Sequence, residues 1–425
     1  MRTHCCAVFI AGVAFSMIFT LGTDSLAAQT RVSGYLQPEW QHYDLRVDPG
    51  DRGLYQNTSK NLFTIRRGRI KATHTTEENF RGVVQINATE RGVALLDAYL
   101  DIPALDSNLL DIRIGRFSKP NFSVLLSSSK REATERAQVI RSLYTGERDI
   151  GVMLTTSPEI GGITPTLQFA LFNGALGARE FDSFKDVTAR LHVPIIDGET
   201  SDFAIGGTWY VGGLRLVDDS VVRFVDGNRV VESADANESW PGWGNRNHIG
   251  LELQAGIDLL DAGRTVLRGE FLIGQMPSAD ERSAFAFTEG TIEIDTTIVI
   301  DSAGTSVLRD SIILRPGIDT STVNVSTLAL RDQMGYYIEL AQPILTNLTA
   351  AIRYDYYDRN TGLSGVNATA SSDRASSVIG FGLLASFGPV RLTGWYEMPA
   401  FDAEEAGKSD VADNKATIRF QYKYK

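Results

Sequence analysis

Cysteine is almost absent from this sequence. Its 425 residues include two, Cys5 and Cys6, and both lie in an N-terminal stretch that carries Arg2, an apolar run over 7–21 and small residues at 25–27. That combination predicts a secretory signal peptide over residues 1–27 and a mature chain over residues 28–425. The mature chain then has no disulfide framework, no thiol nucleophile and no cysteine-based metal site.

Long hydrophobic runs and positive net charge are also missing. After residue 28, no run approaches the roughly 18 continuous apolar residues of a transmembrane helix. A mature chain without such a helix can cross a membrane only as a closed barrel, because every backbone hydrogen bond must be made inside the protein. The net charge of −11, which removal of residues 1–27 leaves unchanged, argues against nucleic acid as a partner.

The chain does contain regular alternation. Segments of about ten residues, in which apolar and polar side chains alternate, recur to the C-terminus, as in the strands of transmembrane β-barrels. Pro38 disfavours full pairing inside the first segment, and Leu96 and Leu100 are expected on the apolar face of the fourth. Sixteen such segments occur, at 31–43, 62–74, 80–88, 93–102, 109–117, 148–156, 166–173, 186–193, 202–211, 249–257, 265–273, 335–343, 348–357, 377–387, 390–398 and 416–424.

The connections between these segments alternate in length. Short ones lie at 75–79, 103–108, 194–201, 258–264, 345–347 and 388–389, and long ones at 44–61, 118–147, 216–247, 276–332, 358–375 and 399–414. An outer-membrane barrel has short turns on one side and long loops on the other, whereas a soluble β-sandwich has no reason to keep this alternation. We therefore predict an all-β fold, a transmembrane antiparallel β-barrel of about 16 strands.

The longest connection, 276–332, contains two further strand signals, at 291–300 and 311–314. These segments could be a seventeenth and eighteenth wall strand, or a hairpin that projects outside the barrel. Their faces are rich in Thr and Asp and lack a continuous apolar stripe. The projecting hairpin is therefore favoured, and 276–332 is expected to be an extracellular loop insertion.

The connection 118–147 contains a helix signal and is expected to be the third loop on the long-loop side of the barrel. A loop of this length is usually functional, so we expect it to fold into the pore and to contain a short helix. The alternative is a solvated surface helix, in which Arg131–Glu135 and Glu132–Arg136 would form i,i+4 ion pairs. The helix signal consists of a capping box, Ser129-x-x-Glu132, followed at helical spacing by Ala133, Ala137, Ile140 and Tyr144.

Basic residues are prominent on the polar faces of the strands and in this loop. Acids are also present on the polar faces, and many are expected to pair with basic residues across neighbouring strands. Rings of Arg and Lys suit anion or phosphate pores, although basic side chains in a barrel can also serve only to balance acids. The candidate pore-lining residues are Arg67, Arg69, Lys71, Arg81, Arg113 and Arg353 on strands, and Lys130, Arg131, Arg136 and Arg141 in the loop.

Several runs of the sequence resemble one known family, the phosphate-selective porins O and P. They are IGRFSKPNFS, TERAQVI and above all GERDIGVML, together with FTIRRGRIKATHT, FRGVVQINA and the terminal TIRFQYKYK, so that the resemblance spans nearly the whole mature chain. The resemblance implies a sixteen-stranded, usually trimeric outer-membrane channel whose third loop folds inward and whose arginine ladder guides phosphate. The chain departs from the family at its end, which is Tyr424-Lys425 rather than a terminal aromatic residue.

The expected function is therefore a passive diffusion channel for small anions, such as phosphate or polyphosphate-like solutes. We expect a homotrimer in the outer membrane of a Gram-negative bacterium, in contact with lipid and lipopolysaccharide. No enzymatic activity, cofactor or metal site is predicted. One alternative is a general or carbohydrate-preferring porin without anion selectivity, for which the acids of the polar faces and Tyr99, Tyr357 and Trp395 argue. Another is a surface adhesin on a barrel scaffold, with 276–332 as the binding element.

Overall fold

The structure is a computed structural model of the 425-residue chain. Within the described ranges, no helix is both long and apolar enough to cross a membrane. The predicted signal peptide over 1–27 lies outside the described residues. The structure describes residues 29–44, 61–104, 109–144, 146–174, 184–215, 220–225, 227–233, 243–279, 293–300, 306–313, 328–363, 373–401 and 414–424.

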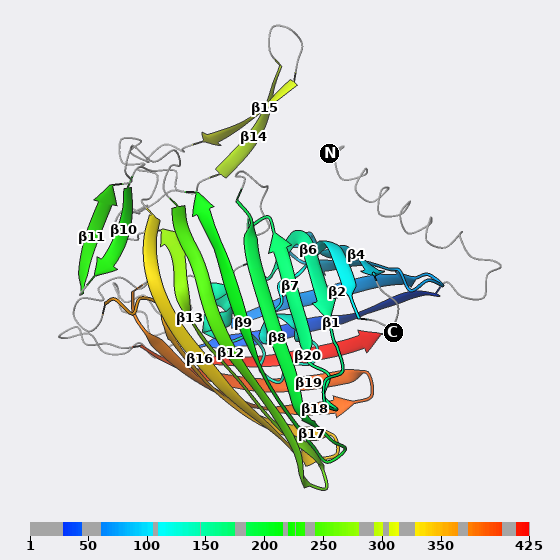
Figure 1. Cartoon of the computed structure of the whole chain (residues 1–425). Coiled ribbons are helices and arrows are strands. Elements are labelled where there is room, and N and C mark those ends of the chain that lie inside the picture. The colour runs from blue at the N-terminus through cyan, green and yellow to red at the C-terminus, as the bar shows by residue number, and fades with distance from the viewer. Residues whose placement is uncertain are drawn as a thin grey trace.

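Sixteen strands form a closed antiparallel β-barrel (Figure 1). Each wall strand pairs with the next, and β1 pairs with β20 to close the wall, with Glu39 opposite Arg419. The predicted fold class and strand number are confirmed. The wall strands are β1 (Gln29–Tyr43), β2 (Asn61–Thr75), β3 (Arg81–Thr89), β4 (Gly92–Pro103), β5 (Asp111–Ser118), β6 (Arg148–Thr156), β7 (Thr166–Phe172), β8 (Asp186–Asp197), β9 (Ser201–Arg215), β12 (Trp243–Leu260), β13 (Gly263–Ala279), β16 (Leu328–Leu345), β17 (Leu348–Asp358), β18 (Ser376–Phe387), β19 (Val390–Phe401) and β20 (Lys415–Tyr424).

The two ends of the barrel differ in their connections. At the short-turn end, where β1 begins and β20 ends, two residues join β16 to β17 and two join β18 to β19. The long-loop end carries the connections from β1 to β2 and from β5 to β6. The turn from β3 to β4, between Thr89 and Gly92, also lies at the long-loop end and is short, so the predicted alternation has one exception.

The wall strands direct apolar side chains outward and polar side chains inward. In β17, Ile352 is 49% exposed on the outer face, whereas its neighbour Arg353 points inward and is 5% exposed. Successive side chains of a strand point to opposite faces, so this alternation separates an apolar outer band from a polar lumen.

A β-bulge in the first strand pair changes which side chains face the lumen. Gln37 of β1 lies opposite Arg67 of β2, and Pro38 lies opposite Ile65, so Arg66 has no partner across the pair. Pro38 lacks a backbone N–H and cannot donate to a regular ladder. The irregularity expected at Pro38 is therefore present, and its consequence is that Arg66 is the extra residue of the bulge.

A second bulge corrects the predicted face of β4. The pairing with β3 places Gln85 opposite Asp97 and Ile86 opposite Leu95, which leaves Leu96 as the extra residue. Leu95 is 49% exposed on the outer face before the bulge, and Leu100 is 41% exposed after it. The expectation that Leu96 shares the outer face with Leu100 is wrong, because the bulge shifts the period-two alternation by one residue.

Among the described residues, two hairpins lie outside the wall. β10 (Ser220–Val225) pairs with β11 (Asn228–Ser233) and runs parallel to the first residues of β16, which makes one 18-stranded sheet with the sixteen wall strands. β14 (Glu293–Ile300) and β15 (Ser306–Ile313) pair with each other in a separate two-stranded sheet. The two strand signals of 276–332 are therefore not wall strands. The extracellular position of the region 276–332 stays a prediction.

The ends of the region 276–332 belong to the wall. Met276 of β13 pairs with Arg331 of β16, and Ala279 pairs with Leu328. The wall thus extends four residues into the expected insertion at its start, as far as Ala279. A loop insertion, in the sense of chain outside the wall strands, can begin only after Ala279 and must end before Leu328.

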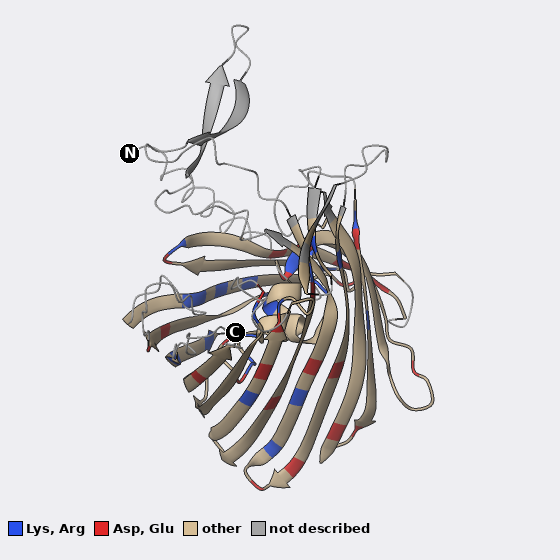
Figure 2. Cartoon of the chain, turned by 90° about the vertical axis from the view of Figure 1, so that its left-hand side faces the viewer, with Lys and Arg blue, Asp and Glu red and all other residues tan. Residues whose placement is uncertain are grey.

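The third loop connects β5 to β6 and lies inside the barrel, where Figure 2 shows its helical part enclosed by the wall. It contains two short helices, α2 (Phe122–Leu125) and α3 (Gln138–Leu143). A short helix in the loop is present, as expected, but the expected start at the capping box of Ser129 is wrong, because the residues between α2 and α3 form a turn at 128–130 and otherwise bends and irregular chain. The Ser129 hydroxyl bonds that of Ser127 at 3.1 Å, and the carbonyls of the segment accept hydrogen bonds from the wall, which a helix would use internally.

Candidate functional site

The first turn of the loop is attached to a buried carboxylate of the wall. Glu270 in β13 accepts hydrogen bonds from Asn121 Nδ2 at 2.6 Å and from the Ser123 backbone N–H at 3.2 Å. The Asn121 side chain also caps α2, since its oxygen accepts the backbone N–H of Val124 at 3.0 Å. Asn121 therefore fixes both the start of α2 and its position against β13.

The second helix packs on the same side of the lumen through apolar side chains. Val139 and Ile140 of α3 are 0% and 1% exposed and belong to a buried cluster with Leu272, Tyr337 and Tyr357 of the wall. Burial of an aliphatic side chain of this size stabilises a fold by about 1.5–3 kcal/mol. The loop is thus held by apolar packing at α3 as well as by hydrogen bonds at α2.

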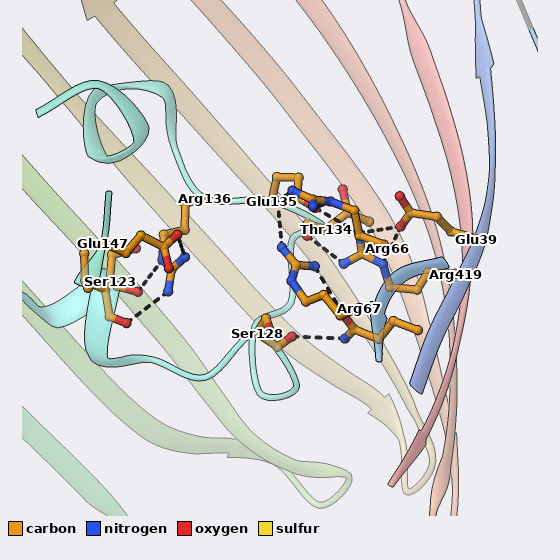
Figure 3. A network of polar contacts seen from close by, with 12 residues as sticks. Glu39, Arg66, Arg67, Ser123, Ser128, Thr134, Glu135, Arg136, Glu147 and Arg419 are labelled. Atoms are coloured by element: carbon orange, nitrogen blue, oxygen red, sulfur yellow. Dashed lines mark hydrogen bonds and ion pairs between the residues drawn. The ribbon is translucent and has the colours of Figure 1, made fainter. Parts of the chain in front are cut away.

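Between the helices, Glu135 is the charged centre of the loop (Figure 3). Its carboxylate accepts from Arg66 Nε at 2.8 Å and Nη2 at 3.1 Å, from Arg67 Nη2 at 2.9 Å, and from Arg419 Nη2 at 3.1 Å. Arg419 also donates to Glu39 of β1, Nε to Oε2, at 2.7 Å. One loop carboxylate thus joins three guanidinium groups from β2 and β20.

The sequence brings Arg66 and Arg67 to this carboxylate through the bulge opposite Pro38. Adjacent residues of a regular strand point to opposite faces. Because Arg66 is unpaired with β1, both guanidinium groups reach Glu135 (Figure 3). The strict alternation used for the sequence prediction places Arg66 outside the lumen and therefore misses it.

Backbone carbonyls of the same loop segment accept hydrogen bonds from Arg419 again and from two further arginines. Arg419 Nη1 donates to the carbonyl of Thr134 at 2.6 Å, and Arg353 Nη1 donates to the carbonyl of Glu135 at 2.6 Å. Arg391 Nη2 donates to the carbonyl of Arg131 at 3.1 Å. Arginines of β17, β19 and β20 therefore hold the backbone of this segment, independently of any loop side chain.

Arg136 cross-links the two halves of the loop. Its guanidinium donates to the carbonyls of Ser123 at 2.8 Å and Val124 at 2.9 Å, and it forms an ion pair with Glu147 (Figure 3). Glu147 also pairs with Arg148 at the start of β6, at 3.3 Å. These contacts connect α2, at the start of the loop, with Glu147, at its end before β6.

Arg131 is buried without a hydrogen-bond partner. It is 5% exposed, and among the described residues none of its three guanidinium nitrogens finds an acceptor. Burial lowers the pKa of Arg131 well below its usual value, and the nearby guanidinium groups of Arg136 and Arg67 lower it further. Burial alone would raise the pKa of Glu135, but the surrounding arginines, Arg67 first, lower it well below the usual value. Glu135 therefore stays ionised at neutral pH.

A cavity of about 600 Å³ lies between the loop and the wall at the short-turn end. The strand residues that line it come from β1 to β6 and from the end of β20. The loop contributes residues from Val124 to Ser127, Ser129 and Arg136. The basic residues that line it are Arg31, Arg69, Lys71, Arg81, Arg113, Arg136, Arg148 and Lys423.

Some of these basic side chains have carboxylate partners. Asp101 pairs with both Arg81 and Arg113, with an Nε–Oδ1 distance of 2.6 Å for Arg113. Arg148 pairs with Asp97 at 2.6 Å. The predicted pairing across strands is therefore present. Among the described residues that line the cavity, eight side chains are basic and one, Asp97, is a carboxylate. Asp101 and Glu147 pair with lining arginines but do not line the cavity themselves.

A second, much smaller cavity of about 20 Å³ lies on the other side of the loop. Its wall residues come from the long-loop ends of β17 to β20, among them Asp355, Glu397 and Lys415. Arg136 lines both cavities. The loop residues around Arg136 therefore lie between the basic cavity and a small space near the long-loop ends of β17 to β20.

The ten predicted pore residues fall into distinct groups. Arg69, Lys71, Arg81, Arg113 and Arg136 line the basic cavity. Arg67 and Arg131 are buried where the loop meets the wall. Arg141 and Arg353 line the small cavity together with Arg136, and Lys130 is exposed on the loop and lines neither cavity.

Arg31, Arg148, Arg66 and Glu135 are absent from the predicted set. Arg31 and Arg148 begin their segments and line the basic cavity. Two adjacent arginines in β2, together with a proline in the strand that pairs with it, could have indicated that Arg66 faces the lumen. No local pattern indicates that Glu135 bonds Arg66, Arg67 and Arg419, because these partners lie 68 to 284 residues away in sequence.

The aromatic residues that favoured a carbohydrate pore are mostly covered. Tyr357 is 3% exposed and Trp395 is 2% exposed, and both belong to buried clusters that include loop residues. Tyr99 lines the basic cavity, but the guanidinium of Arg113 lies 4.1 Å from the centre of its ring. Such a cation–π contact occupies the ring face that would stack on a sugar.

Comparison of the sequence with protein families finds no matching family model, and comparison with curated proteins finds no match. The structure is similar to that of the outer-membrane channel DcaP of Acinetobacter baumannii, with a TM-score of 0.53, 14% identity and coverage of 95% of this chain and 99% of that chain. It is also similar to an anion-selective porin from Comamonas acidovorans, with a TM-score of 0.53, 10% identity and coverage of 93% and 100%.

A third similar structure is the trimer form of OmpT, an outer-membrane protein of Vibrio cholerae, with a TM-score of 0.51, 10% identity and coverage of 94% of this chain and 100% of that chain. Identities of this size establish the fold alone. The chain thus has the closed barrel fold of Gram-negative outer-membrane porins and channels. Its selectivity has to be argued from its own residues.

Proposed function

We propose that this protein is an outer-membrane channel through which small anions diffuse passively. The observation that carries the proposal is the composition of the basic cavity's lining, in which eight basic side chains and one carboxylate occur among the described residues, in a chain whose net charge is −11. Concentration of one charge sign along the passage is how barrel pores select ions. The acidic groups elsewhere in the chain do not cancel this local excess.

Electrostatics inside the pore favours this proposal over control by the net charge. At an ionic strength of 0.1 M, charges more than about 10 Å apart are largely screened. An ion in a cavity of about 600 Å³ lies within that distance of most of the lining groups. It is therefore more affected by nearby groups such as Arg69 and Lys71 than by acids in the outer loops.

The proposal extends to location and assembly. The fold shared with outer-membrane channels, one of them described as a trimer, supports a homotrimer in a Gram-negative outer membrane. There the exposed outer band would contact lipid and lipopolysaccharide. Barrels of this class place their short turns in the periplasm, so the basic cavity would open toward the periplasm and the region 276–332 would be extracellular. The proposal also includes export by the signal peptide over residues 1–27.

Phosphate and related oxyanions are the finer proposal. Guanidinium groups match the oxygens of phosphate with paired hydrogen bonds, and Arg69, Arg81, Arg113, Arg136 and Arg148 line the cavity. The sequence resemblance to the phosphate-selective porins O and P agrees with this assignment. The anion-selective porin from Comamonas acidovorans shares the fold at 10% identity and adds support for anions in general, not for phosphate.

The main alternative is a general or carbohydrate-preferring porin without anion selectivity. It is less favoured because Tyr357 and Trp395 are buried and the ring of Tyr99 is covered by Arg113.

Single-channel recording in a potassium chloride gradient distinguishes these functions. A reversal potential that indicates chloride over potassium, with partial block of chloride current by added phosphate, is expected. Chloride preference without phosphate block would reject the finer proposal alone. Equal permeation of both ions, with current blocked by maltodextrins, would favour the carbohydrate porin.

A further inference from the structure

The carboxylate of Glu135 lies where an anion would be bound. It accepts four hydrogen bonds, at 2.8–3.1 Å, from Arg66, Arg67 and Arg419. Two oxygens surrounded by three guanidinium groups match the arrangement in which arginines hold a free oxyanion. Here, however, the anion is not a free solute but the side-chain carboxylate of a loop residue.

We propose that Glu135 is a tethered internal anion, which fills a three-arginine oxyanion site and thereby lowers the affinity of the pore for divalent oxyanions. This inference rests on the proposed anion path and adds the residue that tunes it. A channel must bind a permeating ion weakly enough to release it. Without Glu135, the cluster of Arg66, Arg67 and Arg419 would hold an oxyanion and impede its passage.

The charges around the site support competition between Glu135 and a free anion. Three guanidinium groups face two carboxylates, Glu135 and Glu39, so the cluster retains one positive charge in the wild type. Removal of the Glu135 charge would leave two. The side chain of Arg66 is 45% exposed, so that solvent and ions reach the cluster at this arginine.

The structure also indicates that the loop does not depend on the Glu135 charge for its position. Arg419, Arg353 and Arg391 donate to the carbonyls of Thr134, Glu135 and Arg131 at 2.6, 2.6 and 3.1 Å. Contacts to backbone atoms survive any change of the Glu135 side chain. Asn121 and α3 hold the flanking parts of the loop. The Glu135→Gln variant, which keeps the size and one acceptor oxygen, should therefore keep the loop in place.

The test measures block of chloride current by sodium sulfate in single channels, with wild type, Glu135→Gln, Glu135→Asp and Glu159→Gln. Sulfate is used because it stays divalent over the whole neutral pH range. Glu159 is exposed in the turn after β6, so Glu159→Gln removes the same charge away from the site. Correct folding of each variant is checked by the mobility shift on heating before electrophoresis.

We expect the concentration of sulfate for half-maximal block to fall by about tenfold or more in Glu135→Gln, which corresponds to about 1.4 kcal/mol of added affinity. It should remain near the wild-type value in Glu135→Asp and Glu159→Gln. An unchanged value in Glu135→Gln would overturn the inference, as would failure of Glu135→Gln to fold while Glu135→Asp folds, since Glu135 would then be a structural residue. Cation preference in the wild type would instead reject the proposed function itself.

Discussion

Pro38 of β1 and Arg66 of β2 belong to the same β-bulge, in which the proline, opposite Ile65, has no N–H to donate and the arginine has no partner in the ladder. The bulge turns the otherwise outward Arg66 toward the lumen, where it joins Arg67 at the carboxylate of Glu135. A single proline thus contributes to the position of the third loop, about one hundred residues further along the chain.

The two arginines should differ in their effect on stability. Arg67 is 7% exposed at its side chain and Arg66 is 45% exposed. Arg67→Gln should lower the free energy of unfolding by about 2–3 kcal/mol, because it removes a charged hydrogen bond from a largely buried carboxylate. Arg66→Gln should lower it by at most about 1 kcal/mol, since exposed ion pairs contribute little. Urea unfolding in detergent micelles measures both values, and equal losses would contradict this ranking.

The Asn121 cap should control how firmly the loop is held. Asn121→Ala removes the cap of α2 and one donor to Glu270. The expected loss of stability is about 0.5–2 kcal/mol, the usual range for removal of a helix cap. Because the start of the loop is released, current noise in the open channel should also increase. The matched control is Asn347→Ala, in the exposed turn from β16 to β17, which should change neither the stability nor the current noise. Wild-type current noise in Asn121→Ala would contradict the role of Asn121 as an anchor of the loop.

The segment between β13 and β16 should be removable without loss of the pore. β13 ends at Ala279 and β16 begins at Leu328. Replacement of residues 280–327 by a short Gly-Ser linker should leave the heat-modifiable barrel and its conductance unchanged. A deletion that starts at 277 and ends at 331 should impair assembly, because Pro277 pairs with Leu330 inside the wall. Failure of the shorter deletion to assemble would show that the wall depends on this region.

Salt should weaken the selectivity of the wild type. The Debye length falls from about 10 Å at 0.1 M to about 3 Å at 1 M salt. If the basic cavity attracts anions through space, the ratio of chloride to potassium permeability should decrease as the mean salt concentration rises over this range. Reversal potentials at a constant concentration ratio measure it. A ratio that stays constant would point to selection by direct contact alone.

The sequence allowed the wall to be predicted because a strand that faces lipid on one side and water on the other must alternate. The same local rule fails where the backbone is irregular. It places Leu96 on the outer face, although a bulge precedes Asp97, and it overlooks Arg66. These errors have a common cause, since one extra residue puts the alternation on the two sides of a bulge out of phase, whereas the sequence pattern assumes one continuous period.

The loop shows a second limit of local patterns. Spacing within the loop suggests pairs between Arg131 and Glu135 and between Glu132 and Arg136, which an isolated helix would form. In the structure Glu132 pairs with Arg268 of β13, and Glu135 pairs with arginines of β2 and β20. Tertiary partners thus replace the helical ones. The presence of a loop in the pore was predictable, but its contacts were not.

The most direct test of the central claim is the reversal potential of a channel with reversed charge in the basic cavity. Arg69 and Lys71 line this cavity and form no ion pair with any carboxylate in the described part of the chain. Arg91, whose side chain is 83% exposed at the turn from β3 to β4, provides the control Arg91→Glu. In a potassium chloride gradient at 0.1 M, we predict chloride preference for the wild type and for Arg91→Glu, and its loss or reversal in the double variant Arg69→Glu, Lys71→Glu. The same reversal potential in all three proteins would contradict selection by the basic cavity.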